Sequence, residues 1–393
     1  MRLVLAGGGS AGHINPMLAV AQQAKQQGFS ITMIAGKTDI DQNLINNKEY
    51  DVVFIKKVPF PRIPHKKDIL SLSDLLLVIN FFKKTLIFPI AFLLETRKCR
   101  KILQSKKANA VLGFGGFIAS PVYLASIFLK IPIYIHEANV CVGLANKAAS
   151  FFAKRFFTAF PAVVNLNTKN NKSKFQFVGL PLRKEFLAVG KTKNSLTKNS
   201  LTKNNLNKNK LTKNNLNKKV NLLVFGGSQG AKSINQTIIK ALPNLLKICN
   251  ITHITGPGKK QKLSKTNAEN FSYTQLEYSN NMAELLEKTD FTIARAGAGT
   301  VLEIASLAVP ACFVPLPFGN GEQSLNADYL VQKKAAIVCA DKLFSVEFIE
   351  NIIIPLLKNP KKMQLMRANA KKAIKTNASE IIVKTILNDI KNV

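Results

Sequence analysis

A glycine-rich turn near the start of the chain carries an ionisable residue and is the first place where chemistry is expected. The apolar run Leu3–Ala6 is too short for a helix, and Gly7-Gly8-Gly9-Ser10-Ala11-Gly12-His13 separates it from a helical pattern over Met17–Gln27. This order predicts a strand, a tight turn and a helix. Because the first amides of a helix lack intrahelical acceptors, a phosphate or a developing oxyanion is well placed at such a turn. Two interpretations of His13 stand open: an ionisable group at the mouth of a ligand site, or a helix-capping or core histidine.

The same turn contains Gly7-x-Gly9-x-x-Gly12, which alone is a weak signal for a dinucleotide site. The acidic residue that such a site needs is missing, since the second predicted strand, Ile31–Ala35, leads into Gly36 and Lys37. The next segment, Asp39-Ile40-Asp41, resembles the metal-binding Asp-x-Asp of sugar transferases. We interpret it as helix-start carboxylates, because acidic residues collect in first helical turns. The sequence shows no metal-ligand cluster, so neither a metal nor a cofactor is predicted.

Two further strand ends are expected at the same edge of this sheet. Ala108–Leu112 leads into Gly113-Phe114-Gly115-Gly116-Phe117, and Ile131–Ile135 leads into His136-Glu137-Ala138-Asn139. Open α/β folds bind ligands at the carboxyl ends of their strands, so these polar side chains and His13 are expected around one crevice. For His136 and Glu137, a structural pair that shapes the crevice wall is the slightly favoured interpretation.

The second half of the chain opens like the first. Val220–Phe225 predicts a strand, Gly226–Ala231 a turn, and Lys232 begins a helix, so that the amides and the Ser228 hydroxyl can hold a diphosphate. Farther on, a strand ends at Arg295, small residues follow, and Glu303 lies in the first turns of the next helix. A carboxylate there can accept two hydrogen bonds from a ribose diol.

Charge and hydropathy suggest an anionic partner. The chain has 56 Lys and Arg against 22 Asp and Glu, a net charge of +34. Two explanations of this charge stand equally open: a surface that binds an anionic partner, and a compositional drift of the source genome. The segment Ile69–Leu94 is strongly apolar, but Asp74, Lys83-Lys84 and Pro89 divide it into pieces shorter than the ~20 residues that span a bilayer. With basic residues on both sides, it fits helices that dip into an anionic leaflet. Two core helices are the alternative.

The remaining features concern compartment and domain organisation. The five cysteines are far apart and form no Cys-x-x-Cys pair, which argues against disulfides and zinc and for a reducing compartment. No signal-peptide pattern opens the chain, so a cytosolic protein is expected. We predict an N-terminal domain over 1–183, a basic low-complexity insertion over 184–219, a C-terminal domain over 220–360, and helices over 361–393 that brace the two domains.

Residues 191–219 repeat a leucine every five positions, hold nine lysines and no acidic residue, and fit neither a helix nor a strand. We predict a disordered insertion. It has no interleaved aromatic residues and matches no recognised module, so no specific nucleic-acid partner is expected.

Taken together, these motifs resemble the MurG family. MurG enzymes are bacterial transferases that add N-acetylglucosamine from UDP-N-acetylglucosamine (UDP-GlcNAc) to undecaprenyl-diphospho-N-acetylmuramoyl pentapeptide (lipid I), forming lipid II in peptidoglycan synthesis. The resemblance implies the α/β GT-B fold, with two Rossmann-like domains whose parallel sheets face a central cleft. It also implies a peripheral protein on the cytoplasmic face of the bacterial inner membrane. The motifs that carry the resemblance are Gly7–Pro16, Gly113–Phe117, His136–Asn139, Gly226–Ala231, Ala294–Glu303 and Glu322-Gln323.

The resemblance also implies roles for particular residues. His13 becomes the candidate general base for a single displacement with inversion at the anomeric carbon. The chain departs from the family at Glu322, where two adjacent glutamines are common, and in its lysine-asparagine insertion. The implied substrate contacts are Ser10, Ala11 and Gly12 with the donor and acceptor diphosphates, Arg183 and Ser228 with the donor phosphates, Asn139 and Gln323 with the donor sugar, Ser279 near the uracil, Ala298, Gly299, Thr300, Val301 and Leu302 around the nucleoside, and Glu303 with the ribose hydroxyls.

Two alternatives remain open. Another GT-B enzyme, such as a lipid galactosyltransferase or a UDP-GlcNAc epimerase, would bind the donor without transferring sugar to lipid I. A non-enzymatic basic protein would bind nucleic acid or membrane with an affinity that falls steeply with salt, and would not bind a nucleotide sugar.

Overall fold

The computed structural model describes residues 1–45, 49–58, 72–166, 173–190, 219–262, 267–268, 271–318 and 321–392. These residues form two compact units, one of residues 1–181 with 377–393 and one of residues 182–376. The predicted boundary after Arg183 therefore lies just inside the second unit. Of the stretch predicted to be disordered, residues 191–218 lie outside the residues that the structure describes.

The first unit is built on a parallel sheet, as its sequence predicts, with the strand order β3-β2-β1-β4-β5-β6-β7. Its central strand sends Leu3 and Leu5 into one core and Val4 and Ala6 into another, so the sheet is buried on both faces. The strands are β1 (Arg2–Ala6), β2 (Ser30–Gly36), β3 (Asp51–Ile55), β4 (Ala110–Gly113), β5 (Ile133–Glu137), β6 (Ala153–Thr158) and β7 (Phe175–Phe177).

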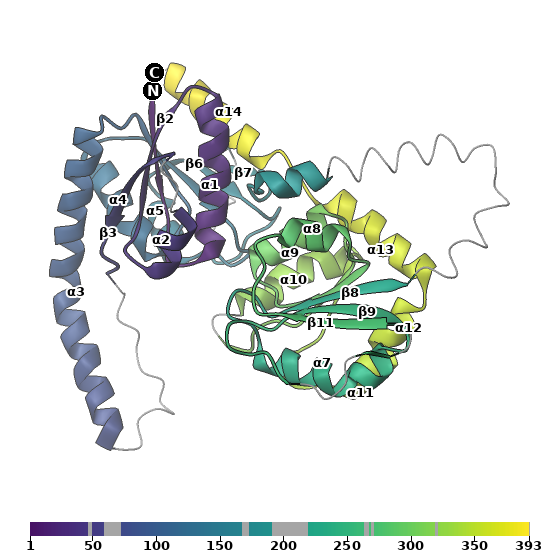
Figure 1. The fold of residues 1–393 in the computed structure, drawn as a ribbon. Helices are drawn as coiled ribbons and strands as arrows, with labels where there is room; N and C mark the ends of the chain where they lie inside the picture. The colour runs from purple at the N-terminus through teal and green to yellow at the C-terminus, as the bar shows by residue number, and fades with distance from the viewer. Residues whose placement is uncertain are drawn as a thin grey trace, which may run out of the picture. The chain divides into compact units, whose positions relative to one another are not determined.

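Helices from both ends of the chain cover this sheet (Figure 1). Helix α1 (Ala11–Gln26) and the C-terminal helix α14 (Ala378–Lys391) share one core, and the Nε of Arg155 lies 3.1 Å from the Oδ2 of Asp389 on α14. The other face carries α4 (Gly116–Phe128) with residues of α3 (Leu72–Ser105) and α5 (Leu144–Ala149). Helix α14 thus completes the first unit, while α13 (Pro360–Ala373) belongs to the second. The bracing role predicted for residues 361–393 remains a prediction.

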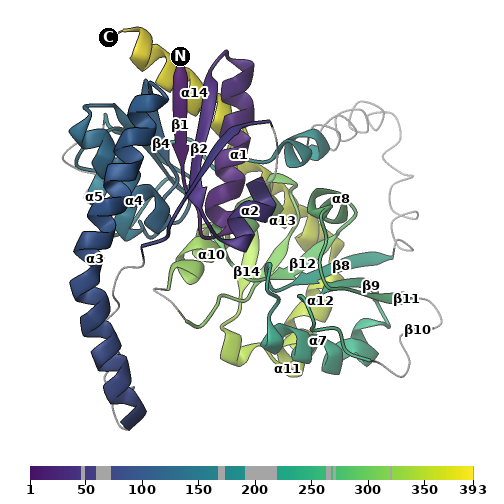
Figure 2. The same cartoon turned by 60° about the vertical axis from the view of Figure 1, so that its left-hand side comes forward.

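Helix α3 (Leu72–Ser105) differs from the expected short pieces, because it is one helix of 34 residues that contains Pro89. A proline removes only one backbone donor, and the helix continues through Pro89, which is exposed (Figure 2). The part of α3 that packs in the core beside α4 comes later, at Cys99 and Leu103. In the part of the chain that the structure describes, no helix is long and apolar enough to cross a membrane. Among the α3 side chains that the structure describes, five aliphatic ones are nevertheless exposed: Leu86, Ile87, Ile90, Leu93 and Leu94.

The second unit contains a sheet in the order β10-β11-β9-β8-β12-β13-β14, in which only the β10–β11 pairing is antiparallel among the described strands. The predicted strand Val220–Phe225 is confirmed as β8. The other strands are β9 (Cys249–Ile254), β10 (Asn267–Ala268), β11 (Phe271–Leu276), β12 (Phe291–Ala294), β13 (Ala311–Phe313) and β14 (Ala336–Val338). The helices that concern the site are α7 (Lys232–Leu245), α8 (Met282–Glu287), α9 (Ala298–Ser306) and α10 (Glu322–Gln332).

Candidate active site

The turn after β1 fixes the tautomer of His13. The Nδ1 of this half-buried imidazole lies 3.0 Å from the Gly8 carbonyl oxygen and 3.2 Å from the Ser10 hydroxyl. A carbonyl oxygen only accepts, so Nδ1 carries the hydrogen and the neutral ring keeps its lone pair on Nε2. Among the described residues, Nε2 makes no hydrogen bond. His13 therefore presents a proton acceptor that its own turn does not use.

The Asp41 carboxylate, which belongs to another element, binds the backbone of this turn. Asp41 lies in the first turn of α2 (Asp39–Ile45), as predicted, but its side chain is fully buried. It accepts hydrogen bonds from the amides of Gly9, at 2.8 and 3.0 Å, and Gly36, at 3.0 Å. A Cβ on Gly8 would lie 2.6 Å from the Asp41 carboxylate, so the close approach requires glycine there. No pattern in the sequence pointed to this contact.

The second glycine turn meets the first at His13. Gly116 has a φ of +77°, and a Cβ on it would lie 2.8 Å from the Gly8 carbonyl and 3.2 Å from the His13 Nδ1. Gly116 also begins helix α4, whose first turn contains no acidic residue. The structure thus brings together two of the three predicted strand ends, and places the ring of His13 between their turns.

The third strand end is tied to the second by buried hydrogen bonds. The Tyr123 hydroxyl donates to Asn146 Oδ1 at 2.8 Å, and the Asn146 amide donates to Glu137 Oε2 at 2.9 Å. The other Glu137 oxygen accepts from the backbone amide of Asn139 at 3.0 Å. Burial raises the pKa of the Tyr123 phenol, so this hydroxyl stays protonated as a donor. The Glu137 oxygen that binds the Asn139 backbone also accepts from the Asn139 side-chain amide at 3.4 Å, so Glu137 holds both the backbone and the side chain of Asn139.

His136 is fully buried beside Phe114, and its Nε2 lies 3.0 Å from the Gly179 carbonyl oxygen. Burial lowers the pKa of this imidazole to about 4, so it is neutral near pH 7. The hydrogen bonds of His136 and Glu137 join the segments around the site, which agrees with the structural role that the sequence analysis slightly favoured.

The second unit carries a pocket of about 540 Å³ at its own glycine turn. Gly227 and Gly230 have positive φ angles, and a Cβ on Gly230 would lie 1.9 Å from the Thr255 carbonyl oxygen. The turn leads into α7, whose first amides receive no side-chain cap and meet no acidic side chain in the first turn. Three predicted substrate contacts, Ser228, Thr300 and Gln323, line this pocket together with Lys232 and Arg295.

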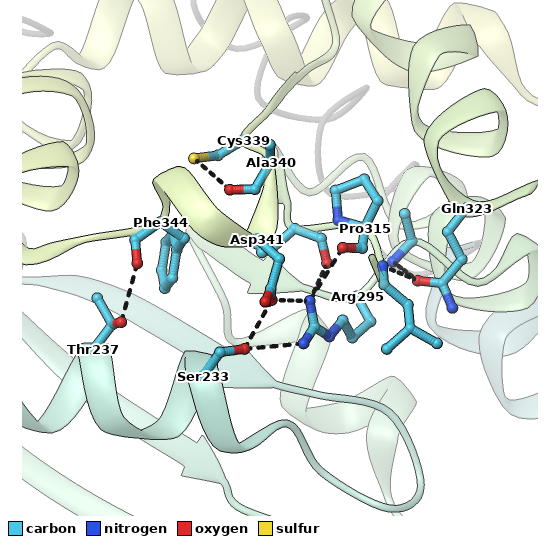
Figure 3. Close-up of polar contacts among 12 residues, drawn as sticks. Ser233, Thr237, Arg295, Pro315, Gln323, Cys339, Ala340, Asp341 and Phe344 are labelled. Atoms are coloured by element: carbon cyan, nitrogen blue, oxygen red, sulfur yellow. Dashed lines mark hydrogen bonds and ion pairs between the residues drawn. The ribbon is translucent and has the colours of Figure 1, made fainter. Parts of the chain in front are cut away.

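A buried arginine connects the wall of this pocket (Figure 3). The Arg295 guanidinium forms an ion pair with Asp341 and donates to the carbonyl oxygens of Val314 and Pro315 at 3.0 and 3.2 Å. Its other terminal nitrogen donates to the Ser233 hydroxyl at 3.0 Å, and that hydroxyl donates to Asp341 at 2.8 Å. These bonds join α7 and the end of β12 to the segments that follow β13 and β14. The sequence placed Arg295 only at a strand end and gave no sign of its partner.

Helix α9 offers backbone donors more than side chains. The backbone hydrogen bonds of α9 begin at Val301, whose amide donates to the Gly297 carbonyl oxygen. The amides of Ala298, Gly299 and Thr300 come before this first bond and have no acceptor within the helix. Val301 and Leu302 are buried in the core. Any contact of these two residues with a nucleoside must therefore come from the backbone, and their predicted binding roles remain predictions.

The two predicted charged contacts pair with one another. Arg183 Nη2 lies 3.3 Å from Glu303 Oε1, while Arg183 Nη1 lies 3.1 Å from Glu185 and the guanidinium stacks 4.8 Å from the Phe186 ring centroid. Burial raises the pKa of Glu303, and Arg183 opposes that shift. In the structure, therefore, the carboxylate predicted to bind the ribose (Glu303) and the guanidinium predicted to bind the phosphates (Arg183) neutralise each other's charge.

The remaining predicted contacts have structural partners. Gln323 uses Oε1 to accept from the amides of Ala296 and Leu316 at 3.2 and 3.0 Å, which leaves its amide group to face the pocket. Ser279 accepts from the Asn281 amide at 3.1 Å ahead of α8 and does not line the pocket. Among the described residues, no group of three or more His, Cys, Asp or Glu side chains is arranged to hold a metal ion.

Comparisons with known proteins agree with this geometry. The N-terminal and C-terminal domain models of glycosyltransferase family 28 match residues 3–158 and 221–384. The UDP-N-acetylglucosamine--N-acetylmuramyl-(pentapeptide) pyrophosphoryl-undecaprenol N-acetylglucosamine transferase of Paenarthrobacter aurescens is 32% identical over 99% of this chain and 96% of its own length. The same transferase of Rhodococcus erythropolis is 33% identical over 99% and 94%.

Solved structures point the same way. Acinetobacter baumannii MurG matches with a TM-score of 0.72 and 27% identity over 98% of this chain and 99% of that one. The UDP-GlcNAc 2-epimerase of Neisseria meningitidis, at 14% identity and a TM-score of 0.61 over 99% and 100%, shares the fold alone. The predicted resemblance and the GT-B fold class, with two Rossmann-like parallel sheets, are thereby confirmed.

Proposed function

Because the chain belongs to the MurG transferases of glycosyltransferase family 28, we propose that it transfers N-acetylglucosamine from UDP-GlcNAc to the 4-hydroxyl of lipid I. The product is lipid II, and the anomeric configuration inverts in a single displacement. The observation that carries the chemistry is the His13 Nδ1 bond to the Gly8 carbonyl, which leaves the lone pair on Nε2.

In this mechanism, His13 removes the proton from the acceptor hydroxyl as the oxygen attacks the anomeric carbon. A positioned general base contributes typically 10²–10⁴-fold to such a step. In the neutral ring, the hydrogen that Nδ1 donates to Gly8 leaves the lone pair on Nε2, where it can accept the proton of the hydroxyl. Ser10, Ala11 and Gly12 lie at the start of α1, whose first turn contains no acidic side chain, so their amides suit the acceptor diphosphate.

The second unit is proposed to bind the donor. The diphosphate lies at the amides of the Gly226–Ala231 turn and the Ser228 hydroxyl, where the N-terminus of α7 stabilises the charge that develops on the departing UDP. Glu303 accepts from the ribose hydroxyls, and Arg183 turns from it to the phosphates. Gln323 and Asn139 contact the sugar, Ser279 lies near the uracil, and Ala298–Leu302 lie along the nucleoside.

The protein is further proposed to work as a peripheral protein on the cytoplasmic face of the bacterial inner membrane. Support comes from the exposed aliphatic side chains of α3, of which Leu86 is 75% and Ile90 65% exposed, beside the exposed Arg97, Lys98 and Arg100. Apolar side chains between basic ones suit an interface with anionic headgroups.

Vesicle sedimentation tests this contact. The double variant Leu86→Asn/Ile90→Asn is expected to lose binding to anionic vesicles at low salt. The matched control is Leu365→Asn, which replaces an equally apolar exposed side chain on α13 of the other unit and is expected to sediment like the unchanged protein. Unchanged sedimentation of the double variant would remove α3 from the interface.

The transfer itself is tested by UDP release from UDP-GlcNAc with and without a short-chain lipid I analogue. Release that requires the acceptor, with formation of the disaccharide lipid, is the expected result. Donor hydrolysis or epimerisation that ignores the acceptor would instead favour another GT-B activity. Absence of any UDP-GlcNAc binding, with salt-sensitive binding to nucleic acid, would reject the enzyme altogether.

A further inference from the structure

Asp41 is a buried carboxylate that the proposed reaction has not used. It is fully buried, and its two oxygens accept from the amides of Gly9 and Gly36. Its own backbone amide is bonded to the Thr38 hydroxyl at 3.2 Å, which fixes the start of α2 beneath the turn. A buried charge is costly unless it is hydrogen-bonded, and here both partners are backbone amides of the segments next to the candidate base.

The peptide unit between Gly8 and Gly9 connects this carboxylate to the base. Its N–H donates to Asp41, and its C=O accepts from His13 Nδ1. We propose that Asp41 is a positioning residue for His13 that acts through the Gly8–Gly9 peptide, holding the imidazole in the tautomer that keeps Nε2 free. This inference rests on the proposed role of His13 as the general base.

The physical basis is polarisation along a hydrogen-bonded chain. A hydrogen bond to a carboxylate is stronger than one between neutral groups, and it draws the N–H of the peptide toward Asp41. The carbonyl oxygen of the same peptide becomes a better acceptor, because successive hydrogen bonds strengthen one another. The Nδ1–H bond of His13 is therefore strengthened both before the proton arrives at Nε2 and after the ring has become an imidazolium.

The turn has other anchors, which separate this role from simple support. The Gly7 amide donates to the Ile34 carbonyl at 3.2 Å, and the Phe114 amide donates to the Ala6 carbonyl at 2.8 Å. Neither bond involves Asp41. Asparagine has nearly the same shape as aspartate, and its oxygen can still accept from one amide. The variant Asp41→Asn therefore removes the charge and one acceptor while these backbone anchors remain.

A double-mutant cycle tests the inference. Asp41→Asn is expected to lower kcat about 10- to 100-fold, the usual cost of losing a group that orients a reacting ligand, with the donor KM nearly unchanged. His13→Ala is expected to lower kcat about 10³-fold. The double variant is expected to match His13→Ala, because Asp41 acts only through the imidazole. Independent, multiplying losses would overturn the proposal, and so would wild-type kcat in Asp41→Asn.

The matched control is Asp39→Asn, which makes the same charge change at an exposed position of the same helical turn. It is expected to keep the wild-type kcat. If His13→Ala were fully active, the base assignment and with it the proposed mechanism would fail. If His13→Ala were inactive while Asp41→Asn remained fully active, only the role of Asp41 would fail.

A spectroscopic measurement on the unchanged protein tests the His13–Gly8 hydrogen bond, on which the proposal depends, even if Asp41→Asn does not fold. The chain has four histidines, so the ¹⁵N resonances of His13 can be assigned by comparison with His13→Ala. The neutral ring is expected to show the Nδ1–H tautomer. A ring protonated on Nε2 instead would overturn the proposal, because the bond to Gly8 would not exist. In folded Asp41→Asn, a mixture of tautomers is expected.

Discussion

The two units contain the same sequence pattern and use it differently. Each has a strand, a glycine turn and a helix whose first turn contains no acidic residue, at Gly7–Gly12 in the first unit and Gly226–Ala231 in the second. In the first, the Gly9 amide is occupied by Asp41 and the turn orients an imidazole. In the second, the turn opens into a pocket beside Lys232. Glycines fix the backbone of both turns, and side chains from neighbouring elements decide whether a turn also orients a base.

The largest expected effect separates these two uses. His13→Ala should lower kcat about 10³-fold with little change in the donor KM, because it removes the base and no donor contact. Ser228→Ala should instead raise the donor KM about 10-fold, because it removes the hydroxyl that we propose as a donor to the diphosphate. Steady-state UDP release at varied donor concentrations measures both constants. If both variants changed the same constant, the two turns would not have separate functions.

The second prediction concerns the backbone of the donor turn. Gly230→Ala should lower the free energy of unfolding by about 3 kcal/mol, because φ is +69° and the new Cβ would lie 1.9 Å from the Thr255 carbonyl oxygen. Gly227→Ala is the matched control, since its φ of +86° carries a similar strain and nothing lies within 4 Å. That variant should lose only about 1 kcal/mol. Urea unfolding compares them, and equal losses would show that strain alone matters.

A third prediction compares the carboxylates of two ion pairs that differ in exposure. Asp341→Asn should lower the free energy of unfolding by about 2 kcal/mol, less than for a fully buried pair because its side chain is 18% exposed. Glu49→Gln is the control, since its pair with Lys25 is about half exposed and is expected to contribute less than about 1 kcal/mol. Urea unfolding of both variants measures the difference. Similar losses would mean that the Arg295 network adds little stability.

The sequence predicted the parts of the fold that depend on local pattern. Val220–Phe225 is apolar apart from Asn221 and lies between polar and glycine-rich segments, and it forms β8 as predicted. The sequence did not reveal that Asp41 reaches Gly9, because that contact depends on the packing of α2 below the sheet edge. It also did not reveal the Arg183–Glu303 pair, whose members are 120 positions apart.

The smallest expected effect tests a feature that the two units share, a buried neutral histidine on a strand of each sheet, His136 on β5 and His253 on β9. In the second unit, His253 lies 3.0 Å from Asn235 and 2.9 Å from Tyr273, and burial lowers its pKa to about 4. Between that value and about 6.5, the unfolded chain binds a proton that the folded chain does not. The contribution of His253 to stability is therefore present above pH 6.5 and is lost as the pH falls toward 4.

Lowering the pH from 6.5 to 5.5 should accordingly cost the second unit about 1 kcal/mol through this histidine. His253→Gln, which cannot titrate, should be less stable at neutral pH but should show a shallower dependence on acid. Urea unfolding followed by a probe in the second unit, over pH 5.5–7.5, gives both slopes. His136, also neutral through burial, remains in both proteins and serves as the internal reference for the first unit. Identical slopes for the two proteins would mean that His253 takes up its proton without unfolding, and that its contacts with Asn235 and Tyr273 do not depend on a neutral ring.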